Sequence, residues 1–461
     1  MRSLTAKVTG VLAVMLSCIG CSVFKEYERP EGVVPANLYG ELPGGAVTVV
    51  SDSTGIEAIG WRDFFTDLAL QALIELGLRN NADLQIAALR VVESEATLQS
   101  ARLSFYPSFS ISPSFQMQNS KNLGGSAVGF SIAPAASWEL DLRGSLTNKK
   151  RYAEAALEQS KLLERSVRTE LVSSIAQMYY TLVMLDAQKE ISSSTFRNWQ
   201  ENVRIMRAMK DAGMANEASV TQTEANCSSI EASLYDLDKR IMTAENSLAL
   251  LLGVPPGHFE RGEFRGLELS GKFAAGVESV LLARRPDVMA AEQSLRMAYY
   301  DTNVARSAFY PSFRLSGEYG WEKALTSPAA WVLGLAANAA APIFDAGRNR
   351  NNLKIAEARQ QEALIAFRQS LLQAGNEVNS AIASCNLAES KKDIRIRQIE
   401  SLNRAVESTR QLMSHSESTY LEVLTAQQSL LSARLQQVAD HFEMVQGVIS
   451  LYRALGGGGD Y

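Results

Sequence analysis

The sequence offers little that could bind a metal or carry covalent catalysis. Its three histidines lie far apart and show no metal-ligand spacing: His258, His415 and His441. The motifs of serine hydrolases, phosphate-binding loops and zinc proteases are absent, as is a Cys-x-x-Cys beside a βαβ unit. We therefore expect no enzymatic activity, no metal site and no bound cofactor.

The chain also lacks a strong excess of one charge. It carries 45 Lys and Arg against 50 Asp and Glu, and 46% of its residues are hydrophobic. This composition excludes a wholly disordered chain and a basic nucleic-acid binder, so we expect no nucleic-acid partner.

Long apolar runs are missing after Cys21. A transmembrane helix needs about 18 or more apolar residues. The most apolar later run, Trp331–Phe344, is interrupted by Asn338 and Pro342. Any membrane span of the mature chain must therefore consist of strands.

The first residues read as an export signal. Arg2 and Lys7 precede a short apolar run, Val8–Met15, which ends at Cys18-Ile19-Gly20-Cys21. A small residue before a cysteine resembles the lipobox of bacterial lipoproteins. We therefore expect residues 1–20 to be removed and Cys21 to receive a diacylglycerol and an amide-linked acyl chain, which together anchor it stably. The alternative is an ordinary signal peptide with incidental cysteines.

The rest of the chain is a duplication. Tyr106-Pro107-Ser108-Phe109 recurs as Tyr310-Pro311-Ser312-Phe313, a shift of 310 − 106 = 204, and Asp141 recurs as Asp345 with the same shift. The predicted organisation is an anchored extended segment (21–60), repeat 1 (61–253), an equatorial linker (254–276), repeat 2 (277–456) and a flexible tail (457–461).

Each repeat predicts the same order of elements. A helix comes first, over Leu68–Leu103 or Val277–Ala308, and ends before the Tyr-Pro motif because proline lacks an amide donor. A β-hairpin follows, and then a helical hairpin. The predicted ranges are 106–141 with 147–252 in repeat 1, and 310–345 with 349–455 in repeat 2, with helical turns near 213 and 416.

Period-two alternation marks the β-hairpins. Phe109, Ile111 and Phe115 alternate with Ser110 and Ser114, although the fourth strand has small residues on both faces. A half-buried soluble sheet is one interpretation. A lipid anchor without a transmembrane helix favours apolar-out barrel strands. Four strands cannot close a barrel, and three copies, with twelve strands, form the smallest assembly with a lumen.

The long helices carry heptad patterning. From Cys227 through Ile230 and Leu237 to Leu248, apolar residues are spaced alternately by three and four, which predicts helix packed against helix. The first helix of each hairpin has some 65 residues, which corresponds to roughly 100 Å. Cys227 and Cys385 should lie too far apart along these helices to form a disulfide.

Several motifs together resemble the TolC superfamily, and most closely its OprM/NodT-type lipoprotein branch. They are Gly20-Cys21-Ser22 with Tyr27-Glu28-Arg29-Pro30, the two Tyr-Pro-Ser-Phe motifs, Arg284-Arg285-Pro286-Asp287 with Ala291-Glu292, Leu421–Gln427 and Leu451–Gly457. The resemblance implies an all-α-dominated membrane protein with a β-barrel. Each protomer would supply four barrel strands and long coiled-coil helices to a trimer with a 12-stranded β-barrel and a 12-helix α-barrel.

The resemblance also implies functional positions. Adaptor docking would use the helical tips Gly213, Met214, Ala215, Ser416, Glu417 and Ser418. The periplasmic aperture would be lined by Glu422 and Ser219, with Glu217 and Glu224 as nearby acidic substitutes. The second tip has serine where the family has glycine, and Ser219 leaves the acidic ring half complete.

The resemblance predicts an outer-membrane exit duct of a tripartite efflux system that passively conducts small molecules such as drugs and toxic compounds. Its partners would be two further copies of the chain, a periplasmic adaptor and an inner-membrane pump, usually of the resistance–nodulation–division type. Two alternatives remain open: a type I protein-secretion channel and a structural periplasmic coiled-coil lipoprotein. Paired in-register hairpins favour a duct over the structural protein.

Overall fold

The computed structural model of the protein describes residues 24–30, 32, 60–120, 125–262, 285–323, 330–340, 345–414 and 420–457. Cys21 and the tip residues Ser416, Glu417 and Ser418 lie outside these ranges. The chain divides into two compact units. Unit 1 combines Met1–Val33, Ala88–Leu163 and Met289–Ser370, and unit 2 combines Val34–Ala87, Glu164–Val288 and Leu371–Tyr461. Each unit takes segments from both sequence repeats, so a repeat is not a compact unit by itself.

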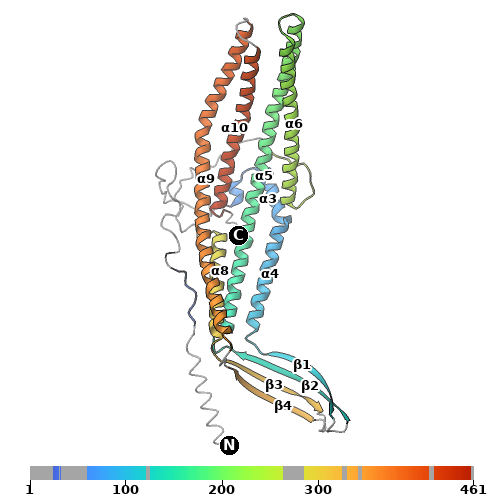
Figure 1. The fold of residues 1–461 in the computed structure, drawn as a ribbon, viewed down its shortest axis with the longest axis vertical. Coiled ribbons are helices and arrows are strands. Elements are labelled where there is room, and N and C mark those ends of the chain that lie inside the picture. The colour runs from blue at the N-terminus through green and yellow to red at the C-terminus, as the bar shows by residue number, and fades with distance from the viewer. Residues whose placement is uncertain are drawn as a thin grey trace. The chain divides into compact units, whose positions relative to one another are not determined.

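Helices dominate the described chain (Figure 1). In chain order the elements are α2 (Trp61–Phe64), α3 (Leu68–Asn80), α4 (Ala82–Leu103), β1 (Ser108–Ser120), β2 (Gly125–Leu140), α5 (Ser145–Asp211), α6 (Glu217–Leu252), α8 (Pro286–Ser307), β3 (Ser312–Lys323), β4 (Ala330–Ala340), α9 (Arg348–Ser414) and α10 (Tyr420–Ala454). None of the helices in the described ranges has the length and apolar content of a membrane span.

The structure repeats with the shift that the sequence shows. Helices α4 and α8 both have 22 residues and start 286 − 82 = 204 positions apart. Helices α5 and α9 both have 67 residues and start 348 − 145 = 203 positions apart. The aligned aspartates both accept hydrogen bonds from the first turn of the helix that follows. Asp141 accepts from the Thr147 amide at 2.7 Å, and Asp345 accepts from the Asn349 amide at 2.8 Å.

One predicted helix is wrong. Leu68–Leu103 is not continuous, because α3 ends at Asn80 and α4 begins at Ala82. Asn81 has an extended backbone, and its side-chain oxygen accepts the Leu84 amide at 3.0 Å, which caps α4. Its side-chain amide donates to the Leu251 carbonyl at 2.9 Å. In repeat 2, the described part of the predicted helix 277–308 is α8.

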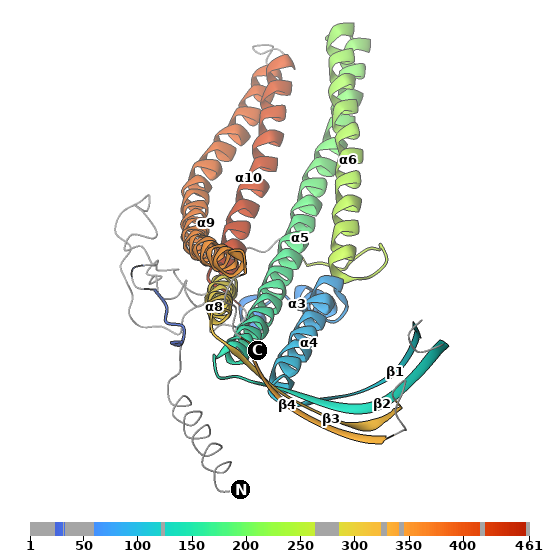
Figure 2. The same ribbon diagram turned by 60° about the horizontal axis from the view of Figure 1, so that its bottom comes forward.

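Unit 1 contains one antiparallel sheet in the order β1-β2-β3-β4 (Figure 2). The register brings the apolar positions of all four strands onto the same face, because Ile111 pairs with Pro134, Ala136 with Gly317, and Gly317 with Leu335. This apolar face carries Phe109, Ile111, Phe115, Met117, Phe130, Ile132, Trp138, Leu315, Tyr319, Trp331, Leu333 and Leu335, all exposed within the chain.

The register also shows which side chains of β4 lie on the apolar face, which the sequence of this strand leaves open. Trp331 pairs with Trp321 and Leu333 with Tyr319, so the large side chains of β4 join the apolar face. The rings of Tyr319 and Trp331 stack with centroids 5.3 Å apart. Strands β1 and β4 are the two edges of this sheet, and each leaves one row of backbone groups without a partner strand.

The main core of unit 2 lies where helices from both repeats meet. Trp61, Phe65 and Ile74 pack with Ile175, Leu248 and Tyr452, all buried. The Phe64 and Tyr452 rings stack at 4.3 Å. Cys227 and Cys385 are both free thiols, as the predicted spacing requires.

Candidate functional site

The turn between α5 and α6 has the geometry of a Schellman motif. Gly213 has φ +71°, and its amide donates to the Lys210 carbonyl at 2.9 Å. The Met214 amide donates to the Met209 carbonyl at 2.8 Å. Met214 is 70% exposed. The tip therefore presents one large apolar side chain to solvent on a hydrogen-bonded turn, in the position where adaptor docking is predicted.

The start of α6 is capped locally. The side-chain oxygen of Asn216 accepts hydrogen bonds from the amide and the hydroxyl of Ser219, at 2.9 and 3.0 Å. Ser219 is one of the predicted aperture residues. In this structure its amide and hydroxyl are both donors to the N-cap residue Asn216 in the first turn of α6.

The acidic residues predicted beside the aperture form ion pairs with basic residues of α5. Glu217 pairs with Lys210, and the hydrogen bond between them raises the pKa of Lys210. Glu224 accepts two hydrogen bonds from Arg207, at 2.9 and 2.6 Å. Glu422 is exposed in the first turn of α10, where the helix dipole favours a carboxylate. The cations of α5 thus offset part of the negative charge expected at the aperture.

The helical hairpin α5–α6 contacts α10 of the second helical hairpin. Trp199 of α5, Ile230 of α6 and Leu424 of α10 form a buried apolar cluster, against which Cys227 packs. The side-chain amide of Asn202 donates to the Gln427 carbonyl oxygen at 3.0 Å. The apolar cluster and this amide pair join α5 and α6 to the first turns of α10 within unit 2.

Because Gly213 adopts the left-handed conformation, a side chain there is strained even though a Cβ would meet nothing within 4 Å. We expect Gly213→Ala to lower the free energy of unfolding by about 1 kcal/mol. Chemical denaturation of the full chain measures this. Gly257→Ala is the matched control, because its Cβ also meets open space and its φ is not left-handed. Equal losses in both variants would contradict the Schellman assignment.

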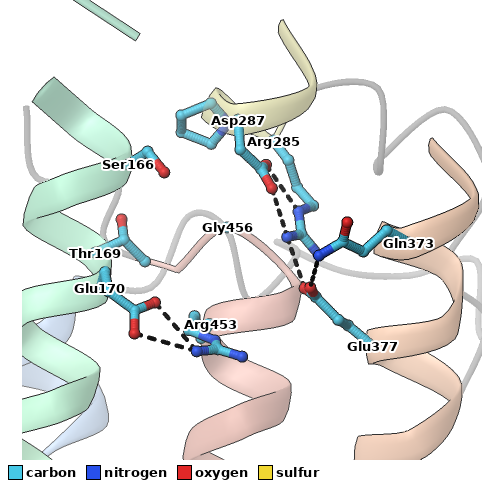
Figure 3. Close-up of a pocket in the computed structure, with 10 residues that line it drawn as sticks. Ser166, Thr169, Glu170, Arg285, Asp287, Gln373, Glu377, Arg453 and Gly456 are labelled. Carbon is cyan, nitrogen blue, oxygen red and sulfur yellow. Dashed lines mark hydrogen bonds and ion pairs between the residues drawn. The ribbon is translucent and has the colours of Figure 1, made fainter. Parts of the chain in front are cut away.

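A polar pocket of about 300 Å³ lies elsewhere in unit 2 (Figure 3). Arg285 is its central residue and its side chain is 8% exposed. The guanidinium lies between two carboxylates and donates to Asp287 at 3.0 and 2.8 Å and to Glu377 at 2.8 Å. It also donates to the Ala454 carbonyl at 3.0 Å, at the C-terminus of α10. Burial alone lowers the pKa of Arg285, but the hydrogen bonds to Asp287 and Glu377 raise it by more.

The second arginine of the pocket is more exposed. Arg453 donates to both oxygens of Glu170, at 3.2 and 3.1 Å, and Thr169 donates to the Gly457 carbonyl at 3.1 Å. Each of the two arginines is thus paired with carboxylates: Arg285 with Asp287 and Glu377, and Arg453 with Glu170. These bonds link α5, α8, α9 and α10. We therefore interpret Arg285 as a structural clamp that holds these helices together. The sequence motif contains Arg285 and Asp287, but nothing in it indicates Glu377 or Glu170.

Within the described ranges, no group of His, Cys, Asp and Glu residues could hold a metal ion. Three features of the described residues stand out: an apolar sheet face, a hydrogen-bonded helical tip and a buried arginine between two carboxylates. None of these arrangements pairs a nucleophile with a base.

Comparison with known proteins agrees with this geometry. The sequence model of the outer membrane efflux protein family matches residues 73–254 and again residues 277–457. The cation efflux system protein CusC of Escherichia coli strain K12 is 31% identical over 456 residues, which cover 96% of this chain and 98% of CusC. The probable outer membrane lipoprotein SilC of Salmonella typhimurium is 27% identical over 451 residues, 96% of each chain.

A solved structure shows the same fold. A crystal structure of CusC, from a study of folding and transmembrane channel formation, superimposes with a TM-score of 0.84 at 30% identity. The match covers 95% of this chain and 100% of that one. Both repeats of the present sequence match the family model, and the chain belongs to the outer membrane efflux protein family.

Proposed function

We propose that the chain is the outer-membrane exit duct of a tripartite efflux system and that it works as a homotrimer. The observation that carries the proposal is the sheet of unit 1. Its apolar face is exposed within the chain, and its edge strands β1 and β4 have unpaired backbone groups. In hydrocarbon every backbone group must be paired, so the sheet enters a bilayer only if β1 of one copy pairs with β4 of the next.

Three copies would supply 3 × 4 = 12 strands, enough to enclose a lumen. The apolar face would contact lipid, and the serine-rich face would line the channel. CusC is named as a cation efflux protein and SilC as a probable outer membrane lipoprotein. These names support small-molecule or ion efflux over protein secretion, and they support lipidation of Cys21.

The partners follow from the same proposal. A periplasmic adaptor would dock on the tips at Gly213–Ala215 and at Ser416–Ser418, and an inner-membrane pump of the resistance–nodulation–division type would select and energise the cargo. The duct itself would conduct passively. Glu422, with Glu217 and Glu224 beside it, would set the charge of the periplasmic mouth, where like charges favour cations.

Single-channel conductance in planar bilayers tests the aperture. We expect Glu422→Gln to reduce the preference for cations over anions, because it removes three carboxylates from the mouth of the trimer. Glu443→Gln in the same helix is the control, since Glu443 pairs with Lys391 far from the tip. Unchanged selectivity in Glu422→Gln would remove Glu422 from the aperture.

A further inference from the structure

The helices of unit 1 form a row in which each one contacts the next (Figure 1). Ser94 of α4 shares a hydrogen bond of 2.7 Å with Ser160 of α5. Gln159 of α5 donates to the Ser294 hydroxyl of α8 at 2.5 Å. The Thr302 hydroxyl of α8 donates to a backbone carbonyl of α9 at 3.2 Å. Within unit 1, α4 and α9 therefore lie at the ends of the row, as β1 and β4 lie at the edges of the sheet.

The duplication makes the end helices of this row counterparts of the middle ones. Helix α8 repeats α4 with a shift of 204, and α9 repeats α5 with a shift of 203. The contact of α5 with α8, which we call the inner interface, therefore has a counterpart between α9 and α4. If β1 of one copy pairs with β4 of the next, α4 of the first copy lies beside α9 of the second. We call this contact between copies the outer interface.

Exposure of the side chains agrees with a second copy at the outer interface. On α5, Ala155 and Leu162 lie on the same face as Gln159, and they are 1% and 6% exposed. Their counterparts on α9 are Ala358, which is exposed, and Ile365, which is 65% exposed. Helix α4 also exposes large apolar side chains, which are Leu89, Val92 and Leu103. Each end helix thus has an apolar surface that a neighbouring copy would cover.

One polar contact of the inner interface becomes two opposite charges at the outer interface. The shift of 203 takes Gln159 to Glu362, and the shift of 204 takes Ser294 back to Arg90. Both residues are exposed, and neither side chain has an ion-pair partner within the described residues. Facing each other, Arg90 and Glu362 attract. Opposite Ser294 or Gln159, either of them would have no partner of opposite charge.

We propose that Arg90 of each copy forms an ion pair with Glu362 of its neighbour, in the place that the Gln159–Ser294 hydrogen bond has inside the chain. The trimer then contains three such pairs, and they occur only at the outer interface. They fix the register of α4 against α9, and they distinguish the outer interface from the inner one, whose helices have the same repeat. The ion pair rests on the homotrimer of the proposed function.

Charge reversal in the full-length, detergent-extracted protein tests the ion pair. Native mass spectrometry measures the fraction of trimer at a dilution where the parent chain stays trimeric. We expect Arg90→Glu and Glu362→Arg each to lower this fraction several-fold, because each variant places like charges opposite one another at all three outer interfaces. The double variant, Arg90→Glu with Glu362→Arg, should return the fraction to that of the parent, because it restores opposite charges.

Arg102→Glu is the matched control, because it reverses the same charge at another exposed residue of α4. The counterpart of Arg102 is Arg306, which pairs with Glu357 of α9 and not with α5, so this position lies outside the outer interface. The control should assemble like the parent. A monomeric parent would overturn the homotrimer and the ion pair together. With a trimeric parent, single variants that assemble normally, or a double variant that does not recover, would overturn the ion pair alone.

Cross-linking with a short bis-maleimide tests the position of the pair. With both native free thiols replaced by serine, we expect Arg90→Cys with Glu362→Cys to give covalent dimers and trimers on denaturing gels. Gln159→Cys with Ser294→Cys is the control, because these residues meet inside one chain. The control should cross-link within the chain and keep the mass of a monomer. If the first pair of cysteines also gives only monomers in a trimeric protein, Arg90 and Glu362 do not meet between copies.

Discussion

Replacing Arg285 with alanine is expected to destabilise the protein by about 1.5–3 kcal/mol. The substitution would leave Asp287 and Glu377 facing a pocket without their cation, and it would remove the donor to the Ala454 carbonyl. Arg285 is the buried member of this group, whereas the side chains of Asp287 and Glu377 are 44% and 27% exposed, so the loss is smaller than for a fully buried ion pair. Thermal and denaturant unfolding of the purified protein measure the effect.

Arg453→Ala is the matched control for this prediction. Arg453 lines the same pocket and also binds a carboxylate, but its side chain is 36% exposed and that of Glu170 is 55% exposed. Exposed ion pairs contribute only about 0–1 kcal/mol. Adding Glu377→Gln to Arg285→Ala should recover part of the loss, because it removes one unpaired charge. Similar losses for Arg285→Ala and Arg453→Ala would show that Arg285 is not a clamp.

A charge on the apolar face of the sheet should abolish assembly in the outer membrane. Phe115 is 66% exposed and lies near the middle of β1 on that face. An arginine on the lipid side of a barrel costs about 2–4 kcal/mol near the bilayer midplane, which amounts to about 6–12 kcal/mol for three copies. We therefore expect Phe115→Arg to leave little heat-resistant trimer in isolated outer membranes.

Ser114→Arg is the control, because it places the same charge one residue away on the opposite face. Ser114 shares a hydrogen bond of 2.7 Å with Ser131, and its loss should cost only about 1 kcal/mol. Assembly of Ser114→Arg should therefore stay close to that of the parent chain. If Phe115→Arg assembles as well as Ser114→Arg, the apolar face does not contact lipid.

Local patterning was sufficient to predict the long helices and the two hairpins. The heptad seam of α6 is buried at Ile230, Leu237 and Leu248, and the alternation of β1 lies on one face of a real sheet. These features repeat over short distances, so their periods are visible in the sequence. Because the chain is duplicated, the same patterns occur in both repeats.

Features set by distant contacts could not be predicted in the same way. The break at Asn81 depends on the Leu251 carbonyl, 170 residues away, while the apolar period continues on both sides of it. The inward and outward faces of β4 depend on pairing with Trp321 and Tyr319. Glu377 joins Arg285 from the middle of a long helix whose sequence does not distinguish it from a solvated carboxylate.

The structure describes the first helical tip and part of the predicted aperture. The structure gives Gly213 the left-handed turn that a tip needs, and it pairs Glu217 and Glu224 with cations of α5. Docking at Met214 and Ala215, the charge of the aperture and the acylation of Cys21 stay predictions.

Single-particle electron microscopy of the detergent-extracted mature protein tests the central claim most directly. We expect a three-fold particle in which twelve strands form one ring, continued by helices of roughly 100 Å around a hollow lumen. A monomer, or a solid coiled-coil rod in which β1 and β4 stay unpaired, would contradict it.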